Sequence, residues 1–201
     1  MKYHLTLLLI FCAALTWSGI APHDYFTWFL EVVPALTGVV VLLLIYPRYK
    51  LTDLTYTLIL LHSIILMVGG HYTYAEVPLF DWIKEALHQS RNNYDKVGHF
   101  AQGFIPAVIT REIIIRDRIV NSSAWLNVFV VSICMAISAA YEFLEWGVAE
   151  MTGESSDAFL GTQGYAWDTQ SDMLYATIGA VTALILLSTF HNKAIKKIQS
   201  I

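Results

Sequence analysis

The sequence predicts an all-α, polytopic membrane protein: one domain over residues 1–201, built as a six-transmembrane-helix bundle with an amphipathic surface helix. Composition is the first observation behind this prediction, because 56% of the residues are apolar, 14% are charged and the mean hydropathy is +0.54. An ordinary soluble domain has about 25% charged residues. The second observation is that the apolar residues gather in six separate runs. We therefore expect the chain to lie in a bilayer.

Each of the six apolar runs has the length of a membrane-spanning helix. The runs cover residues 3–20, 29–46, 54–70, 99–115, 124–148 and 173–190. A helix needs about 17 to 25 residues to cross a hydrocarbon core about 30 Å thick, and every run falls in that range. Aromatic residues near the ends of the runs match the belts of Trp and Tyr found at membrane interfaces. These are Trp17, Tyr25, Trp28, Tyr46, Tyr72, Tyr74, Trp125 and Trp146.

The first run has an alternative interpretation as a cleavable secretion signal. Lys2 precedes it, and Gly19 and Ala21 supply the small residues of a cleavage site. The run is longer than the usual apolar core of a signal, which has about 7 to 15 residues. A first membrane span is therefore the preferred prediction.

The positive charges predict that both termini lie in the cytoplasm. With the N-terminus inside, nine of the twelve Lys and Arg residues fall on the inner side, as the positive-inside rule requires. These nine are Lys2, Arg48, Lys50, Arg111, Arg116, Arg118, Lys193, Lys196 and Lys197. Thirteen of the sixteen acidic residues fall on the outer face or just beneath it. Because Asp and Glu contribute little to orientation, this acidic outer face requires a separate explanation.

Two long connections lie on the outer side. Residues 71–98 contain Pro78, followed by apolar residues at helical spacing with charged residues opposite them. This pattern predicts a short amphipathic helix on the membrane surface. Residues 149–172 contain Gly153, Gly161 and Gly164 among polar residues, which predicts an irregular ordered loop or a re-entrant cap. Connections of this length usually have a function.

Glu142 and Glu145 are ionisable residues inside the fifth apolar run. A charge at membrane depth costs about 2.5 to 3.5 kcal/mol on insertion scales, so such residues are functional candidates. The two lie about 60° apart around a helix and share a face with Ser138 and Ala149, which we expect to turn toward the bundle. Because two close carboxylates repel each other, either one holds a proton or a cation lies between them. We expect Glu142 and Glu145 to be catalytic.

Three other segments bring candidate ligands to the same depth. Asp95 and His99 lie four residues apart before the fourth run, Asp168 and Asp172 have the same spacing before the last, and His71 follows the third. Carboxylate and imidazole together suit a divalent ion such as Zn, Mn or Mg. The sequence therefore predicts a divalent-metal site. Its candidate ligands are His71, Asp95, His99, Glu142, Glu145, Asp168 and Asp172.

Structural roles for the same residues remain open. Asp95, Asp168 and Asp172 are suitable helix caps, and Glu142 could hydrogen-bond to aromatic groups across the bundle. His62 lies alone at mid-membrane depth, where a hydrogen bond to a neighbouring helix is the preferred interpretation.

The remaining polar groups carry little chemical signal. Arg111, Glu112 and Arg116 lie at the inner interface, where topology and mutual pairing explain them. Cys12 and Cys134 lie in apolar runs and are interpreted as small hydrophobic residues. We find no phosphate-binding glycine loop, serine nucleophile elbow or helical His-Glu-x-x-His motif in the sequence.

The order of the polar motifs resembles that of VanZ-like membrane proteins. The matching motifs are Asp95-Lys96-x-x-His99-Phe100, Glu142-x-x-Glu145 and Asp172-x-x-x-Ala176-x-x-Gly179. Glu145 stands where the VanZ-like pattern has Gln, Ala176 stands where it has Asn, and the Arg that usually precedes its final Asp has no counterpart. Over nearly the whole chain, and most specifically over residues 93–103 and 141–179, the sequence is similar to the YjdF-type inner-membrane proteins of bacteria. The resemblance implies a multi-pass fold in the bacterial inner membrane and no established chemistry, although VanZ-like members are associated with glycopeptide resistance.

We therefore expect a multi-pass inner-membrane protein with a carboxylate and histidine site at its periplasmic face. As an enzyme, it would be a metal-dependent hydrolase or transferase acting on a lipid-linked or amphipathic substrate. The alternatives are a proton- or cation-coupled transporter and a non-catalytic protein of envelope assembly. A net charge of −4 and the absence of a Lys/Arg-rich run argue against a nucleic-acid partner. The sequence identifies the lipid bilayer as a partner, but no protein partner.

Overall fold

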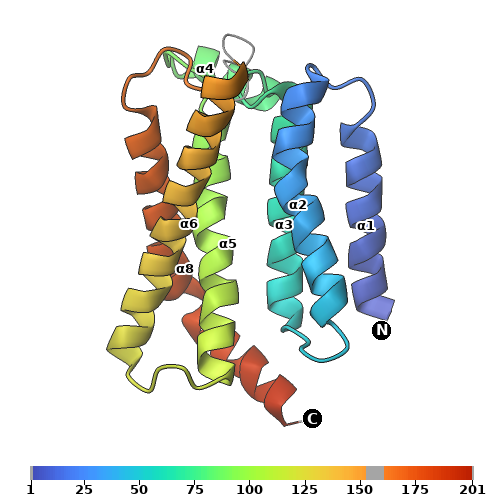
Figure 1. Cartoon of the computed structure of the whole chain (residues 1–201), viewed down its shortest axis with the longest axis vertical. Coiled ribbons are helices and arrows are strands. Elements are labelled where there is room, and N and C mark those ends of the chain that lie inside the picture. The colour runs from blue at the N-terminus through green and yellow to red at the C-terminus, as the bar shows by residue number, and fades with distance from the viewer. Residues whose placement is uncertain (1, 153–160, 201) are drawn as a thin grey trace.

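The computed structural model describes residues 2–152 and 161–200, and over these residues it contains helices and no strand. The helices are α1 (Lys2–Ser18), α2 (Tyr25–Ile45), α3 (Asp53–Tyr72), α4 (Pro78–Ala86), α5 (Tyr94–Arg116), α6 (Ser123–Thr152) and α8 (Asp168–Gln199) (Figure 1). The all-α prediction is confirmed for the described residues. Of the predicted outer connection 149–172, residues 153–160, which include Gly153, lie outside the described residues.

Four helices, α2, α3, α6 and α8, are long and apolar enough to cross a membrane. Helix α1 is apolar but has only 17 residues. Helix α5 has 23 residues but carries charged residues in both end regions, while residues 97–110 between them have none. The multi-pass prediction is thus confirmed, whereas the count of six spans stays a prediction.

Two helices begin earlier than the apolar runs suggested. Helix α5 begins at Tyr94 rather than at residue 99, and α8 begins at Asp168 rather than at residue 173. The physical reason is that these first turns contain the charged residues Asp95, Lys96 and Asp168, which are buried as ion pairs, so hydropathy alone did not reveal the helix starts. As a consequence, Asp95 and Asp172 lie within rigid helices.

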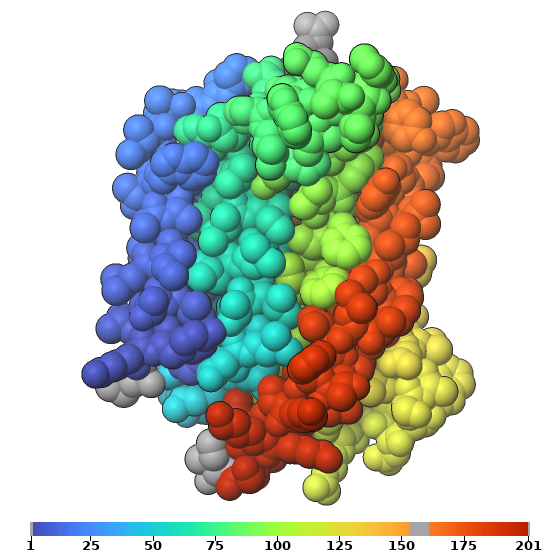
Figure 2. Space-filling model, turned by 180° about the vertical axis from the view of Figure 1, so that it is seen from behind, coloured from blue at the N-terminus to red at the C-terminus, as the bar shows by residue number. Residues whose placement is uncertain are grey.

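The long helices run alongside one another, with both termini at one end and α4 at the other (Figure 1). We call the α4 end the outer end and the opposite end the inner end. Helix α3 contacts α1 and α2 on one side and α5 on the other. Seen from behind, α3 fills the space between α1 and the α5–α8 pair (Figure 2). Helices α5, α6 and α8 pack together as a second group.

Helices α5 and α8 form the most extensive contact of the described chain, and glycines make it possible. A Cβ atom at Gly103 would collide with the backbone carbonyl of Ala176, and one at Gly179 would collide with the carbonyl of Phe100. Small residues let two helix backbones approach closely. The same crossing continues inward through Ala180 and Ala183, which are buried with Ala107 and Val108 in an apolar layer that includes Cys134.

A buried polar network ties the inner ends of α3, α5 and α8 together. The Glu112 carboxylate accepts hydrogen bonds from the Thr52 amide at 2.8 Å, from the Thr55 hydroxyl at 2.6 Å and from Arg116 at 2.9 Å. His191 Nε2 lies 3.2 Å from the same carboxylate, and its Nδ1 lies 3.2 Å from Arg111. Because Arg can only donate, Nδ1 must accept and Nε2 carries the proton toward Glu112. The predicted pairing of Glu112 is thus confirmed with Arg116, and it extends to α3 and α8.

The close contact at Gly103 predicts that a glycine-to-alanine substitution has opposite effects on stability at Gly103 and at Gly147. Gly103→Ala should destabilise the protein by about 1 to 3 kcal/mol, because the new methyl group overlaps the backbone of α8. Gly147→Ala is the matched control: nothing lies within 4 Å of its added Cβ, so it should stabilise helix α6 by up to about 1 kcal/mol. Denaturant unfolding in detergent measures both. Equal effects at the two positions would contradict the close α5–α8 contact.

Candidate functional site

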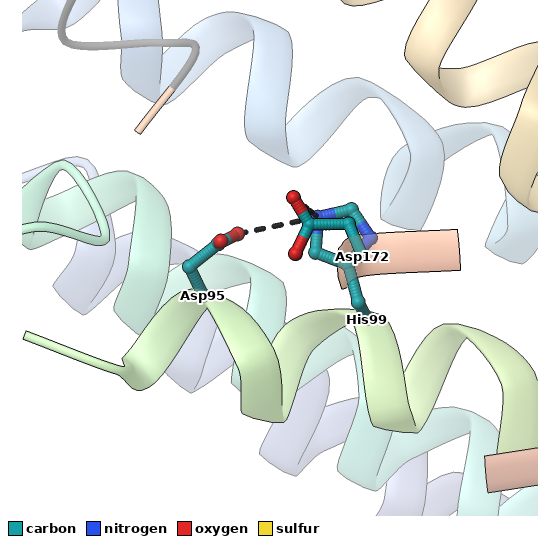
Figure 3. A group of neighbouring side chains, drawn as sticks. All are labelled: Asp95, His99 and Asp172. Carbon is teal, nitrogen blue, oxygen red and sulfur yellow. Dashed lines mark ion pairs between the residues drawn. The ribbon is translucent and has the colours of Figure 1, made fainter. Parts of the chain in front are cut away.

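Asp95 and His99 on α5 face Asp172 on α8 near the outer end of the bundle (Figure 3). His99 Nε2 lies 3.2 Å from Asp95 Oδ1 and 3.8 Å from Asp172 Oδ2. All three residues are buried. Asp95 and His99 share a face because residues four apart on a helix are neighbours, and the close α5–α8 contact brings Asp172 against them. We call these three residues the outer site.

Two cations hold the carboxylate oxygens that do not face His99. Lys96 Nζ donates to Asp172 Oδ1 at 2.5 Å, to Asp168 Oδ1 at 2.8 Å and to Asp95 Oδ2 at 3.3 Å. Arg91 pairs with Asp168 Oδ1 at 2.5 Å and with Asp95 Oδ2 at 3.4 Å. Asp95 Oδ1 and Asp172 Oδ2 are therefore left pointing toward His99. This role of Arg91 and Lys96 was not predicted from the sequence.

Helix α6 carries Glu142 and Glu145, which lie beside the outer site. Both are buried, and so is Ser138, so the predicted polar face of this helix does turn toward the bundle. Glu142 Oε1 lies 4.0 Å from His99 Nδ1 and has no hydrogen-bond partner within residues 2–152 and 161–200. His99 Nδ1 also lies 3.2 Å from Gln102 Oε1. A buried carboxylate oxygen thus faces the site without a partner.

Glu31 on α2 is a further carboxylate that sequence reasoning missed. Its side chain is only 4% exposed, and Tyr141 on α6 donates a hydrogen bond to it at 3.4 Å. The signal was available, because Glu31 lies in the second apolar run and meets the same criterion that singled out Glu142. Through Glu31, the α1–α3 group contributes to the site.

A cavity of about 150 Å³ adjoins the outer site and extends along the bundle to His62 and Pro106. Glu31, Asp95, His99 and Glu145 line its polar end, and His62 lies among its deeper residues. His62 Nε2 has no hydrogen-bond partner in the described part of the chain, so the predicted bond from this nitrogen to a neighbouring helix is not found. The imidazole instead borders the cavity.

The described part of the second outer connection lies over the site. Arg91 donates to the carbonyl of Gly161 at 3.0 Å. The Gln163 side chain accepts from the Asn92 amide at 3.0 Å and donates to the Asn92 carbonyl at 2.9 Å. The Tyr165 ring lies 5.8 Å from the Arg91 guanidinium. Hydrogen bonds and a ring contact therefore hold residues 161–165 against the start of α5.

The charges around the outer site do not balance among the described residues. Arg91 and Lys96 are two permanent cations, and His99 is a third when protonated. The carboxyl groups number six: Glu31, Asp95, Glu142, Glu145, Asp168 and Asp172. Close carboxylates in a poorly solvated site cannot all be ionised without neutralisation. The excess must be removed by bound protons or by a bound cation.

The structure brings six of the seven predicted ligands to one region and leaves one apart. The outer site contains Asp95, His99 and Asp172. Beside it lie Glu142 and Glu145, and Asp168 is linked to it through Lys96 and Arg91. His71 does not join the group. Its Nδ1 lies 3.0 Å from the Ser18 carbonyl, and its ring lies 4.7 Å from that of Trp17. His71 shares the expected depth but belongs to the α1–α3 contact.

The capping roles left open for the three aspartates are not observed. Trp167 is the N-cap of α8 and makes no side-chain capping bond, and Asp172 lies a full turn inside that helix. At the start of α5 the N-cap is Asn93, and the Tyr94 amide donates instead to Asn92 Oδ1 at 3.1 Å. Asp95, Asp168 and Asp172 pair instead with Arg91 and Lys96.

The hydrogen bonds between Gln163 and Asn92 predict how fast the backbone amides of this region exchange with solvent. Gln163→Ala removes two hydrogen bonds to Asn92, so amide hydrogen exchange at Asn92 and at residues 161–165 should become about tenfold faster. Gln170→Ala is the control, because Gln170 is an exposed glutamine of the same region. Exchange measured by mass spectrometry in detergent tests this. Unchanged protection in the Gln163 variant would show that these bonds do not hold the connection.

Comparison with known proteins identifies the family of this chain. Residues 3–193 match the model of a family described as predicted membrane protein (DUF2238). The chain is 49% identical over 193 residues to the inner membrane protein YjdF of Escherichia coli (strain K12), a match that covers 96% of this chain and 90% of that protein. No solved structure matches the chain. Because the family model matches nearly the whole chain, the protein belongs to the DUF2238 family of predicted membrane proteins.

Proposed function

We propose that the outer site binds a divalent metal ion and that the protein acts as a metal-dependent hydrolase or transferase on a lipid-linked or amphipathic substrate. The observation that carries this proposal is the spacing of the three donor atoms. Ligand atoms about 2.1 Å from a tetrahedrally coordinated ion lie about 3.4 Å from one another. The separations of 3.2 and 3.8 Å from His99 Nε2 to the two carboxylate oxygens bracket that value.

The surroundings of the three donors support the same proposal. Metal-binding carboxylates are usually held by further hydrogen bonds to their second oxygen. Lys96 and Arg91 supply such bonds to Asp95, and Lys96 supplies one to Asp172. A bound dication would also remove part of the excess negative charge. The mixed carboxylate and imidazole ligands suit Zn, Mn or Mg.

The proposed chemistry rests on an ion beside the Glu142 carboxylate, whose Oε1 has no hydrogen-bond partner among the described residues. A divalent metal lowers the pKa of a bound water toward neutrality. Glu142, with Oε1 facing His99, is placed to take the proton of that water, and Glu145 is the second candidate. The oxygen of the water then forms a bond to the electrophilic atom of the substrate. The bond to the leaving oxygen breaks, and that oxygen receives the proton held by the glutamate.

A transport function receives less support from the same structure. A path for ions or protons across the membrane needs polar groups throughout its length. The outer site and the inner network around Glu112 are separated by the apolar layer of Ala107, Val108, Cys134, Ala180 and Ala183. These residues offer no side-chain donor or acceptor other than one thiol.

We further propose that six helices span the membrane, with the outer site at the periplasmic face and both termini in the cytoplasm. The inner end holds both termini and the Lys-rich end of α8, in agreement with the positive-inside rule (Figure 1). Helix α4 would lie on the outer membrane surface. Leu79 and Trp82 are exposed on one of its faces, and Asp81 pairs with Lys84 at 3.0 Å.

The metal proposal is tested by elemental analysis of the detergent-purified protein after incubation with Zn²⁺, Mn²⁺ or Mg²⁺ separately. We expect close to one ion per chain in the parent and at least a tenfold loss in His99→Gln and Asp172→Asn, since each removes one of three ligands. Glu76→Gln is the matched control, because this exposed carboxylate of the outer end pairs only with His23 among the described residues. Folded, monodisperse parent protein that retains none of the three ions would refute the proposal.

Orientation is tested by labelling single cysteines introduced into a variant that lacks Cys12 and Cys134. A membrane-impermeant maleimide should label Glu76→Cys in spheroplasts, because residue 76 lies at the outer end, next to α4. It should label Lys193→Cys only after the membrane is permeabilised. The reverse pattern would place the outer site in the cytoplasm.

A further inference from the structure

A second cavity, an apolar groove of about 710 Å³, runs along the inner half of helix α2. Side chains of α2, α3 and α5 form its walls, among them Val41, Leu42, Ile59, Ile105 and Ile109. Helix α2 packs mainly against α3, which leaves its other flank open toward α5. We call this cavity the α2–α5 groove.

The α2–α5 groove adjoins the cavity of the outer site. Pro34, His62 and Leu66 line both cavities, so these three residues mark the junction. The unpartnered His62 Nε2 lies at this point. Above the junction the cavity is lined by Glu31, Asp95 and His99, whereas below it the walls are mainly aliphatic. A cavity with polar walls therefore lies directly next to a groove with apolar walls.

The groove is open because of the residues that α2 carries there. Pro34 lies inside α2 and removes one backbone hydrogen bond, which commonly bends a helix. Gly38 lines the groove, and a Cβ atom added to it would meet nothing within 4 Å. From Pro34 to Ile45 the groove follows twelve residues of helix, whose ends lie about 16 Å apart along the axis. This length is about half of a hydrocarbon core 30 Å thick.

The polar groups at the inner end of the groove already have partners. Tyr49 donates to Asp117 at 3.3 Å, and burial raises the pKa of Tyr49 to about 12, so the phenol stays protonated. The Arg116 guanidinium lies 4.0 Å from the Tyr49 ring and pairs with Glu112. A polar head group is therefore expected at the opposite end, in the cavity of the outer site.

We propose that the α2–α5 groove holds the hydrocarbon chain of a membrane lipid whose head group enters the cavity of the outer site. The occupant must be apolar over about 16 Å, polar at one end, and able to enter from within the bilayer. A single-chain segment of a lipid meets all three requirements. The placement of the head group rests on the proposed function, whereas the binding of the chain does not.

The test uses the full-length protein in vesicles of phosphatidylethanolamine and phosphatidylglycerol. A small share of the phosphatidylethanolamine carries a photoreactive diazirine midway along one acyl chain. After irradiation, mass spectrometry locates the labelled peptides. We expect labels on residues 38–45 of α2 and 105–113 of α5. Gly38→Leu and Ile109→Trp fill the groove from opposite walls, so labelling there should fall about tenfold in both.

Two further variants test whether the labelling is specific to the groove and whether the head group enters the cavity of the outer site. Gly147→Leu is the matched control, because this helical glycine also has open space around it but lies outside the groove, and its labelling should equal that of the parent. His62→Trp narrows the junction, so it should also reduce labelling about tenfold if the head group must pass into the outer cavity. Unreduced labelling in His62→Trp would overturn the placement of the head group and indicate a lipid entering from the inner leaflet.

Other results would overturn the groove itself. Labels spread evenly over all exposed apolar faces, or equal labelling in the Gly38 and Ile109 variants and the parent, would show that the groove binds no chain. Crosslinks joining two copies of the protein across α2 would identify a second copy as the occupant. Metal content is measured in every variant, because Gly38→Leu should keep the metal of the parent. Loss of groove labelling and loss of metal binding are thereby distinguished.

Discussion

The close contact between α5 and α8 is the constraint on which the rest of the structure depends. Gly103 and Gly179 let the two backbones meet without intervening side chains. Two stiff helices in such contact hold their side chains in fixed opposition above and below the crossing. Above it Asp95 and His99 meet Asp172, and below it Arg111 and Glu112 meet His191. One packing interaction therefore positions both polar regions of the protein.

The two polar regions differ in how completely their charges are satisfied. At the inner end the Glu112 carboxylate accepts hydrogen bonds from Thr52, Thr55, Arg116 and His191. A fully satisfied network of this kind is typical of a structural role that links helices. At the outer end, carboxyl groups outnumber cations, and Glu142 Oε1 has no partner among the described residues. A buried polar group without a partner is costly, so it persists where a ligand or a proton completes it.

Much of this arrangement could be predicted from the sequence because helical spacing and hydropathy fix depth and face. The pairs Asp95/His99 and Glu142/Glu145 were placed correctly for that reason. Depth does not fix the direction around the bundle, and His71 therefore lies at the expected level but in the α1 contact. Arg91 and Lys96 could not be assigned without the position of α8, since their partners Asp168 and Asp172 are more than 70 residues away. Glu31 could have been predicted as well, because it is an ionisable residue inside an apolar run.

Helix α8 begins at the site and ends with lysines beyond the bundle. Its 32 residues extend for about 48 Å, whereas a bilayer with its head groups is about 40 to 45 Å thick. The helix is therefore long enough for Lys196 and Lys197 in its last turn to contact the anionic head groups of one leaflet. Asp168 and Asp172, at the other end of the helix, then lie near the opposite leaflet surface. Electrostatic attraction holds the basic end of α8 at one membrane surface. The fixed number of helical turns then sets the distance from that surface to the carboxylates.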